Sequence, residues 1–115
     1  MPQTLSFKNL RVLVLGLGLH GGGLAVANWL ISQGARVTVS DLKTAQELKP
    51  SLKKLIKSPN LKLVLGRQPV SLLKDCDLVV QNPGVPRQAP IIKLARRLKM
   101  PIENEASLFL KICPS

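Results

Sequence analysis

The chain has 115 residues, a length that suits one domain with a sizeable hydrophobic core. Hydrophobic residues make up 45% of it and the mean hydropathy is +0.17, which argues against a disordered polypeptide. The formal net charge of +11 would suit nucleic acid, but the basic residues are spread along the chain and only 3% of residues are aromatic. We therefore expect no nucleic-acid partner.

Targeting and redox features are sparse. No apolar run reaches the roughly 18 residues that a membrane span needs. The start of the chain, MPQTLSFKNLR, lacks the basic and apolar regions of a signal peptide. Cys76 and Cys113 have the spacing of neither a metal site nor a disulfide framework. These features predict a cytoplasmic protein with reduced thiols and no membrane partner.

The first part of the chain predicts two strands joined by a helix. Residues 11–15 are nearly all valine and leucine without alternation, which is typical of a parallel strand buried on both faces. The next helix should end before Gly34, a residue suited to the position after a helix C-terminus. Its apolar face comprises Leu24, Ala27, Leu30 and Ile31. The second strand covers 36–40 and leads into Asp41.

The next segment predicts a capped helix and a third strand. Thr44 and Glu47 have the spacing of a capping box. Pro50 suits the first turn of a helix that we expect to end near Lys57. Lysines at every fourth position would form one exposed, solvated stripe on this helix: Lys49, Lys53 and Lys57. The third strand covers 61–65.

The rest of the chain continues this alternation of strands and helices. We expect a short helix over 70–73, a strand over 77–81, a helix over 89–98, a short strand over 101–103 and a closing helix over 106–112. Alternation of this kind predicts right-handed crossovers between parallel strands. The expected fold is α/β: a Rossmann-like, doubly wound, mainly parallel five-stranded sheet with helices on both faces, forming a single domain over residues 1–115.

The sequence GLGLHG lies between the first strand and the first helix and has the spacing of a dinucleotide-binding loop. Gly16 permits a tight turn, Gly18 leaves room for a phosphate, and Gly21 lets the helix pack closely on the strand. Gly22 and Gly23 are additional glycines, which makes sense where the backbone must approach another group. Because free amides at a helix N-terminus favour an anion, we expect a phosphate ligand here.

Three polar features follow strands: the glycine loop, Asp41, and the turn Asn82-Pro83-Gly84. We expect them at one edge of the sheet, because ligands of doubly wound sheets bind at the carboxyl ends of the strands. Asp41 would accept a hydrogen bond from a ribose hydroxyl or a base. His20, the only histidine, has no nucleophile or acid placed beside it by the sequence, so we expect its backbone to face the ligand.

The sequence contains no GxxxxGK[ST] loop for ATP and no cluster with metal-ligand spacing. No pair of residues with opposed acid and base roles stands out. We therefore assign no catalytic residue and expect a binding module rather than a complete enzyme. An NAD-binding domain of an oxidoreductase or a channel regulator stays open as an alternative, because the glycines of the loop and Asp41 suit it equally.

The order of these motifs resembles the N-terminal domain of the Mur ligases. A strand, G-L-G-x-x-G, a helix, a strand ending in Ser-Asp, and a strand followed by NPGVP occur in the same succession. The segment APIIKLARRLKMPIENEASLFLKI is similar to the last helix, short strand and closing helix of that family, with Glu105 at an acidic position and Leu108-Phe109 at a Leu-Phe pair. The similarity covers about residues 7–113 and is greatest to the ligases that add D-glutamate to UDP-N-acetylmuramoyl-L-alanine.

The resemblance implies that the domain holds the UDP part of a UDP-N-acetylmuramoyl-peptide precursor. By position, the diphosphate would be faced by Leu19, His20 and Gly21, beside Gly16 and Gly18. The residues near the uracil would be Asp41, Leu42 and Lys43, and those closing the pocket would be Asn82, Pro83 and Gly84. The chain departs from the family's usual pattern at His20, where a small polar residue is frequent, and at Ser107, where an acid is common.

The resemblance also implies ATP-dependent amide-bond formation in peptidoglycan synthesis, in which D-glutamate attacks the phosphorylated carboxyl group of the precursor. ATP and Mg²⁺ would bind a central domain of the complete ligase, and this domain would bind no cofactor itself. The central domain would begin near Cys113-Pro114-Ser115. We therefore expect the chain to be a fragment that is inactive alone.

Overall fold

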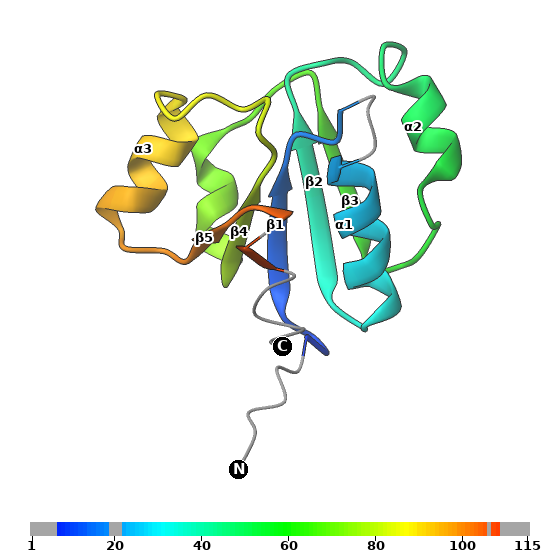
Figure 1. The fold of residues 1–115 in the computed structure, drawn as a ribbon, viewed down its shortest axis with the longest axis horizontal. Helices are drawn as coiled ribbons and strands as arrows, with labels where there is room; N and C mark the ends of the chain where they lie inside the picture. Colours follow the sequence, from blue (N-terminus) through cyan, green and yellow to red (C-terminus); the bar gives the residue numbers. More distant parts are fainter. Residues whose placement is uncertain (1–6, 19–21, 106, 109–115) are drawn as a thin grey trace.

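The computed structural model describes residues 7–18, 22–105 and 107–108. In this part of the chain, parallel strands form one five-stranded sheet in the order β3-β2-β1-β4-β5 (Figure 1). The strands are β1 (Arg11–Leu15), β2 (Arg36–Asp41), β3 (Leu61–Leu65), β4 (Leu78–Gln81) and β5 (Ile102–Glu103). The predicted doubly wound α/β fold is confirmed.

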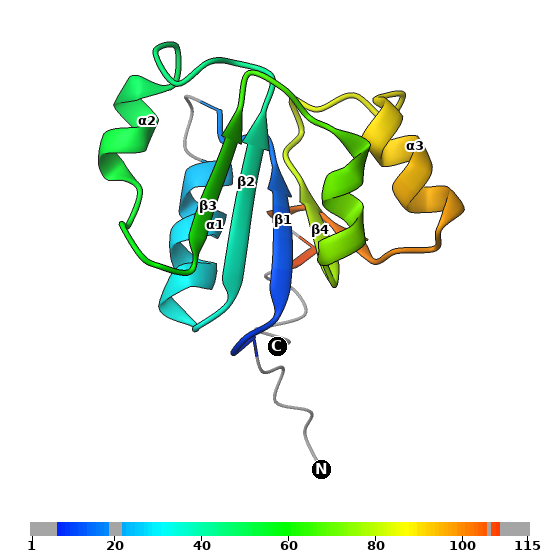
Figure 2. The same cartoon turned by 180° about the vertical axis from the view of Figure 1, so that it is seen from behind.

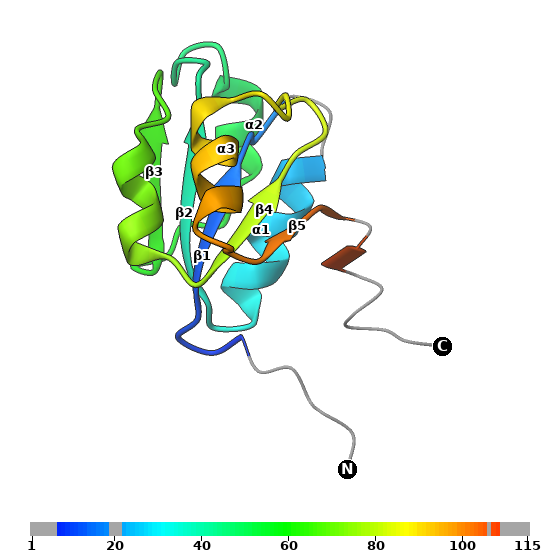
Figure 3. The ribbon, with the colours of Figure 1, turned by 90° about the vertical axis from the view of Figure 1, so that its left-hand side faces the viewer.

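The helices cover both faces of this sheet. They are α1 (Gly22–Ser32), α2 (Lys49–Lys54), the 3₁₀ helix η1 (Val70–Asp75) and α3 (Pro90–Arg97). Figure 1 shows α1 in front of the sheet, and Figure 2 shows α3 from the opposite side. Helices α1 and α3 belong to different cores, on opposite faces of the sheet that Figure 3 shows from the side. The connections therefore place α1 and α2 on one face and η1 and α3 on the other, as a doubly wound sheet requires.

Strand β1 lies between two hydrophobic cores, which explains why its sequence does not alternate between apolar and polar residues. Val12 and Val14 belong to the core under α1, whereas Leu13 and Leu15 belong to the core under η1 and α3. All four side chains are at most 1% exposed. Burial of each such side chain contributes about 2 kcal/mol relative to exposure. The apolar run thus fixes β1 in the middle of the sheet.

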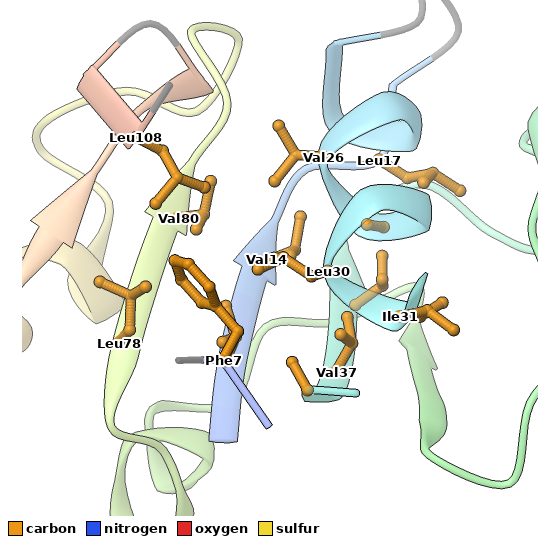
Figure 4. Packing of buried hydrophobic residues seen from close by; sticks show 14 of the residues in the cluster. Phe7, Val14, Leu17, Val26, Leu30, Ile31, Val37, Leu78, Val80 and Leu108 are labelled. Atoms are coloured by element: carbon orange, nitrogen blue, oxygen red, sulfur yellow. The ribbon is translucent and has the colours of Figure 1, made fainter. Parts of the chain in front are cut away.

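The core under α1 is drawn in Figure 4. Val26 and Leu30 of α1 pack over β1, and Leu108, from the far end of the described chain, packs beside Val80 of β4. The ring of Phe7 meets Trp29 edge to face, with 5.2 Å between ring centroids. Segments from both ends of the described chain therefore close the same core.

The capping box forms, but the helix after it is shorter than predicted. The Thr44 amide donates to Glu47 Oε1 over 3.0 Å, and the Glu47 amide donates to Thr44 Oγ1 over 3.3 Å. The hydrogen bonds that Glu47 Oε1 accepts from the Thr44 amide and, over 3.2 Å, from the Thr44 hydroxyl lower the pKa of Glu47. They close a turn that precedes α2, and Pro50 occupies the first turn of α2 as expected.

The end of α2 at Lys54 corrects the predicted end near Lys57. The side chain of Asn28 accepts from the Ile56 amide over 2.8 Å and donates to the Lys54 carbonyl over 3.0 Å, which ties the helix end to α1. Leu55 is extended and buried there. Lys57 therefore lies outside the helix, and of the predicted stripe of lysines only Lys49 and Lys53 lie within α2.

Strand β4 begins at Leu78, one residue after the predicted start at Asp77. Asp77 instead binds Arg11 at the amino edge of the sheet. Its carboxylate accepts from the Arg11 amide over 3.0 Å and pairs with the Arg11 guanidinium over 2.9 Å. This pairing lowers the pKa of Asp77 and raises that of Arg11. Both side chains are partly exposed, so solvent screens the pair.

Two further expectations meet the structure only in part. Glu105, Ser107 and Leu108 are helical, while most of the predicted closing helix, with Cys113, lies outside the described residues.

Cys76 is a free thiol whose pKa is raised mainly by burial. Within the described ranges, no helix is long and apolar enough to cross a membrane.

Candidate functional site

The order of the strands creates a crevice between the loops that follow β1 and β4. The chain adds β2 and β3 on one side of β1, and then returns to add β4 and β5 on the other side. Loops that leave β1 and β4 therefore diverge at the carboxyl edge of the sheet, which is the usual ligand position in doubly wound folds. A cleft of about 870 Å³ lies at this edge.

All the predicted site residues that the structure describes line this one cleft. They are Gly16, Gly18, Asp41, Leu42, Lys43, Asn82, Pro83 and Gly84. Leu19, His20 and Gly21 lie outside the described residues. The structure thus brings together three segments that are far apart in the sequence, as the strand-end argument expected.

Gly16 has a backbone conformation and a neighbour that exclude other residues. Its φ is +88°, in the left-handed region that favours glycine. A Cβ atom at this position would lie 2.9 Å from Cβ of Asn82 and 3.0 Å from Cγ2 of Val85. The glycine at the end of β1 therefore allows close contact with the loop after β4.

Gly23 explains why an additional glycine occurs in α1. A Cβ atom there would overlap the Gly16 carbonyl oxygen and lie 2.7 Å from the Leu17 carbonyl oxygen. The sequence analysis expected the additional glycines to allow a close approach of the backbone, and Gly23 makes such an approach; Gly21, to which it assigned the packing of helix on strand, lies outside the described residues. The first turn of α1 consequently rests directly on the backbone of the glycine loop.

Asp41 holds the glycine loop with its carboxylate. Oδ2 accepts hydrogen bonds from the amides of Leu17, over 2.9 Å, and Gly18, over 3.3 Å. Oδ1 accepts from the amide of Lys43 over 2.9 Å, and the residue is only 8% exposed. The carboxylate that the sequence analysis expected to bind the ligand thus accepts three backbone amides in the structure and positions the glycine loop.

Asn82 connects the two loops of the crevice. Its side-chain amide donates to the Gly16 carbonyl over 3.1 Å, and its Oδ1 accepts from the Gly84 amide over 3.0 Å. Its backbone carbonyl accepts from the Val85 amide over 2.9 Å, which closes the turn. Loss of this side chain would remove its hydrogen bond to the glycine loop.

Ser51 supports the glycine loop from α2 and was missed by the sequence analysis. Its hydroxyl donates to the Gly18 carbonyl over 2.7 Å, and the residue is 4% exposed. Residues 18 and 51 are 33 positions apart, so no local pattern signals this contact. Together Asp41, Asn82 and Ser51 fix amide and carbonyl groups of the loop from three directions.

The cleft contains further residues that were not predicted as site residues: Gln68, Val85, Pro86, Ala89, Pro90, Ile91 and Glu105. Gln68 follows β3, so the strand-end rule could have found it. The group from Val85 to Ile91 continues the loop after β4 and forms an apolar wall. Glu105 was noted only as an acid in the resemblance.

The described lining offers several kinds of binding group. It combines backbone groups of two loops, the cation of Lys43, the carboxylates of Asp41 and Glu105, and an apolar wall. Within the described ranges, no group of three or more His, Cys, Asp or Glu residues could hold a metal ion. Chemically, this arrangement suits an anion joined to an apolar ring.

Residues 10–103 match the family model described as "Mur ligase MurD-like, N-terminal domain". This chain belongs to the Mur ligase family. A relative named UDP-N-acetylmuramoylalanine--D-glutamate ligase, from Roseiflexus sp. (strain RS-1), is 41% identical over 104 residues, which cover 90% of this chain and 22% of the relative. This Mur ligase domain thus spans about a fifth of the length of the curated relatives it matches.

Solved structures of Mur ligases and related enzymes share the fold of this Mur ligase domain. A pseudomurein peptide ligase type C from Methanothermus fervidus matches with a TM-score of 0.66 and 28% identity, covering 87% of this chain and 20% of that chain. UDP-N-acetylmuramate-alanine ligase from Thermotoga maritima matches with a TM-score of 0.64 and 25% identity, covering 87% and 22%. These matches favour the Mur ligase interpretation over an NAD-binding domain.

Proposed function

We propose that this domain binds the uridine diphosphate part of UDP-N-acetylmuramoyl-L-alanine. The proposal extends to a longer ligase that contains the domain and joins D-glutamate to this precursor with ATP. The single observation that carries it is the glycine loop, fixed by Asp41, Ser51 and Asn82 at the switch point of the sheet. A loop held so firmly in a cleft is preorganised for a ligand.

The diphosphate would lie on the glycine loop. Gly18 has a φ of +69°, and no side chain there blocks the approach of an anion. The loop precedes α1, whose N-terminal amides favour negative charge. Lys43 at the edge of the cleft adds a positive charge.

The uracil would lie at the carboxyl end of β2. Leu42 lines the cleft with its side chain 66% exposed, an apolar surface against which a base ring can pack. Asp41, one position earlier, orients the backbone here through the Lys43 amide. This arrangement gives the base an apolar contact and backbone polar groups while the carboxylate holds the loop.

The chemistry of the proposed ligase would take place outside this domain. As the resemblance to the Mur ligases implies, we assign ATP and Mg²⁺ to other parts of the complete enzyme. D-Glutamate would enter there as well. The role of this domain is to hold the nucleotide end of the precursor so that its other end reaches the reacting groups.

Calorimetric titration of the 115-residue chain tests this assignment. We expect UDP-N-acetylmuramoyl-L-alanine and UDP to bind. ADP, which has the same diphosphate charge but another base, should bind about tenfold more weakly, and NADH should not bind. The matched charge of ADP separates recognition of uridine from attraction to a basic protein.

Two results would contradict the proposal. Binding of NADH without either uridine compound would indicate a dinucleotide site. Equal affinity for UDP and ADP, falling steeply with salt, would indicate nonspecific attraction by the net charge of +11.

A further inference from the structure

Glu105 is a cleft carboxylate to which no role has yet been given. It follows β5 by two positions, is half-buried, and lines the cleft together with Gly16 and Lys43. It also borders a small cavity of about 10 Å³ that reaches Gly23 in α1. Among the described residues, no hydrogen bond or ion pair joins its carboxylate to a partner.

Glu105 lies on the β4 side of the crevice. The strand order β2-β1-β4-β5 places the Asp41-Lys43 segment on one side of the glycine loop and the Asn82-Gly84 turn on the other, and Glu105 borders a cavity with Asn82 and with Gly23 of α1 (Figure 1). The argument rests on the proposed function, in which the base occupies the β2 end and the diphosphate the glycine loop. The remainder of the ligand, beyond the second phosphate, then extends toward Glu105.

The chemistry of a carboxylate restricts what can lie against it. An ionised carboxylate only accepts hydrogen bonds, and it repels the phosphates of the ligand. It therefore favours a neighbour that presents donors, as the hydroxyl groups of a pyranose do. The other carboxylate of the cleft, Asp41, already accepts backbone amides on both oxygens. Glu105 is thus the available acceptor on the far side of the diphosphate.

We propose that Glu105 recognises the sugar of a nucleoside diphosphate sugar, by accepting hydrogen bonds from its pyranose hydroxyl groups. This side chain then separates the sugar nucleotide from the free nucleoside diphosphate, which ends before reaching it. The N-acetylmuramoyl group retains free hydroxyl groups that suit this role. The residue determines specificity and takes no part in the reaction.

The test compares two ligands on the substituted chain. Glu105→Gln removes the charge at nearly constant shape, and Glu105→Ala removes both acceptor oxygens. Each is titrated calorimetrically with UDP and with UDP-N-acetylmuramoyl-L-alanine. We expect affinity for the sugar nucleotide to fall about tenfold in Glu105→Gln, and at least as far in Glu105→Ala. Affinity for UDP should stay the same or rise, because a repulsive charge is removed.

Asp75→Asn is the matched control. Asp75 is exposed at the end of η1, before β4 begins, and so lies at the edge of the sheet opposite the cleft. This variant makes the same change in net charge, and we expect both affinities to stay as in the unchanged protein. A loss shared with Asp75→Asn would mean that net charge and not sugar recognition is responsible, and would overturn the proposal.

The remaining outcomes of the titrations also test the assignment of Glu105 to the sugar. Equal weakening of UDP and the sugar nucleotide by Glu105→Gln would place the carboxylate on the ribose or the base and overturn the assignment to the sugar. Unchanged affinity for both ligands in Glu105→Ala would overturn it as well, while leaving the proposed function intact. Failure of the unchanged chain to bind UDP would contradict the proposed function itself, and with it this assignment.

Discussion

Replacing Gly23 with alanine is expected to destabilise the domain by about 2 kcal/mol, although alanine is the better helix former. Helix propensity alone favours alanine by roughly 1 kcal/mol. The added methyl group, however, would overlap the Gly16 carbonyl oxygen and crowd that of Leu17. Because these are backbone atoms, the loop itself must move, and we expect UDP binding to weaken about tenfold. Urea unfolding and calorimetry measure the two effects.

The control for this change is Ala25→Gly, on the exposed side of the same helix. It should cost about 1 kcal/mol through helix propensity and leave the affinity for UDP unchanged. A Gly23→Ala protein that is more stable than the unchanged protein would contradict the close contact between α1 and the glycine loop.

Replacing Asp41 with asparagine is expected to cost about 3 kcal/mol and to weaken UDP binding about tenfold. The carboxylate accepts hydrogen bonds from three backbone amides, on Leu17, Gly18 and Lys43. Asparagine has one acceptor oxygen, and its NH₂ group must then face an amide donor in a nearly buried position. Urea unfolding gives the loss of stability, and calorimetry gives the change in affinity.

A loss of stability together with a loss of UDP affinity in Asp41→Asn would show that Asp41 positions the glycine loop and does not contact the ligand directly. Asp75→Asn, the same substitution at an exposed position, should change neither quantity measurably. If Asp41→Asn abolished UDP binding while the free energy of unfolding stayed constant, Asp41 would contact the ligand directly, and its role as holder of the loop would be wrong.

Much of the fold was predictable because its signals are local. The unbroken apolar run of β1 predicts a strand covered on both faces, and both faces are indeed covered. Gly34, with φ of +84°, closes α1 as its position after the apolar face indicates. The end of α2 was not predictable, because it is set by the side chain of Asn28, which is 26 positions away from Lys54.

The candidate site was predictable in its position but not in its internal hydrogen bonds. Strand ends of a parallel sheet converge, so the glycine loop, Asp41 and the Asn82-Gly84 turn could be placed together from the sequence. Which atoms each side chain binds depends on tertiary distances. The sequence therefore placed Asp41 in the site without predicting that its oxygens accept backbone amides, and it missed the contact of Ser51 with the loop.

The central claim is that a uridine diphosphate binds at the carboxyl edge of the sheet, on the loop after β1. The most direct test is a titration of the ¹⁵N-labelled chain with UDP, followed by amide chemical shifts. We predict that the largest shifts fall on Gly16, Gly18, Lys43 and Gly84, which line the cleft. Shifts concentrated instead on Lys93, Arg96 and Arg97, the exposed basic residues of α3, would contradict the claim.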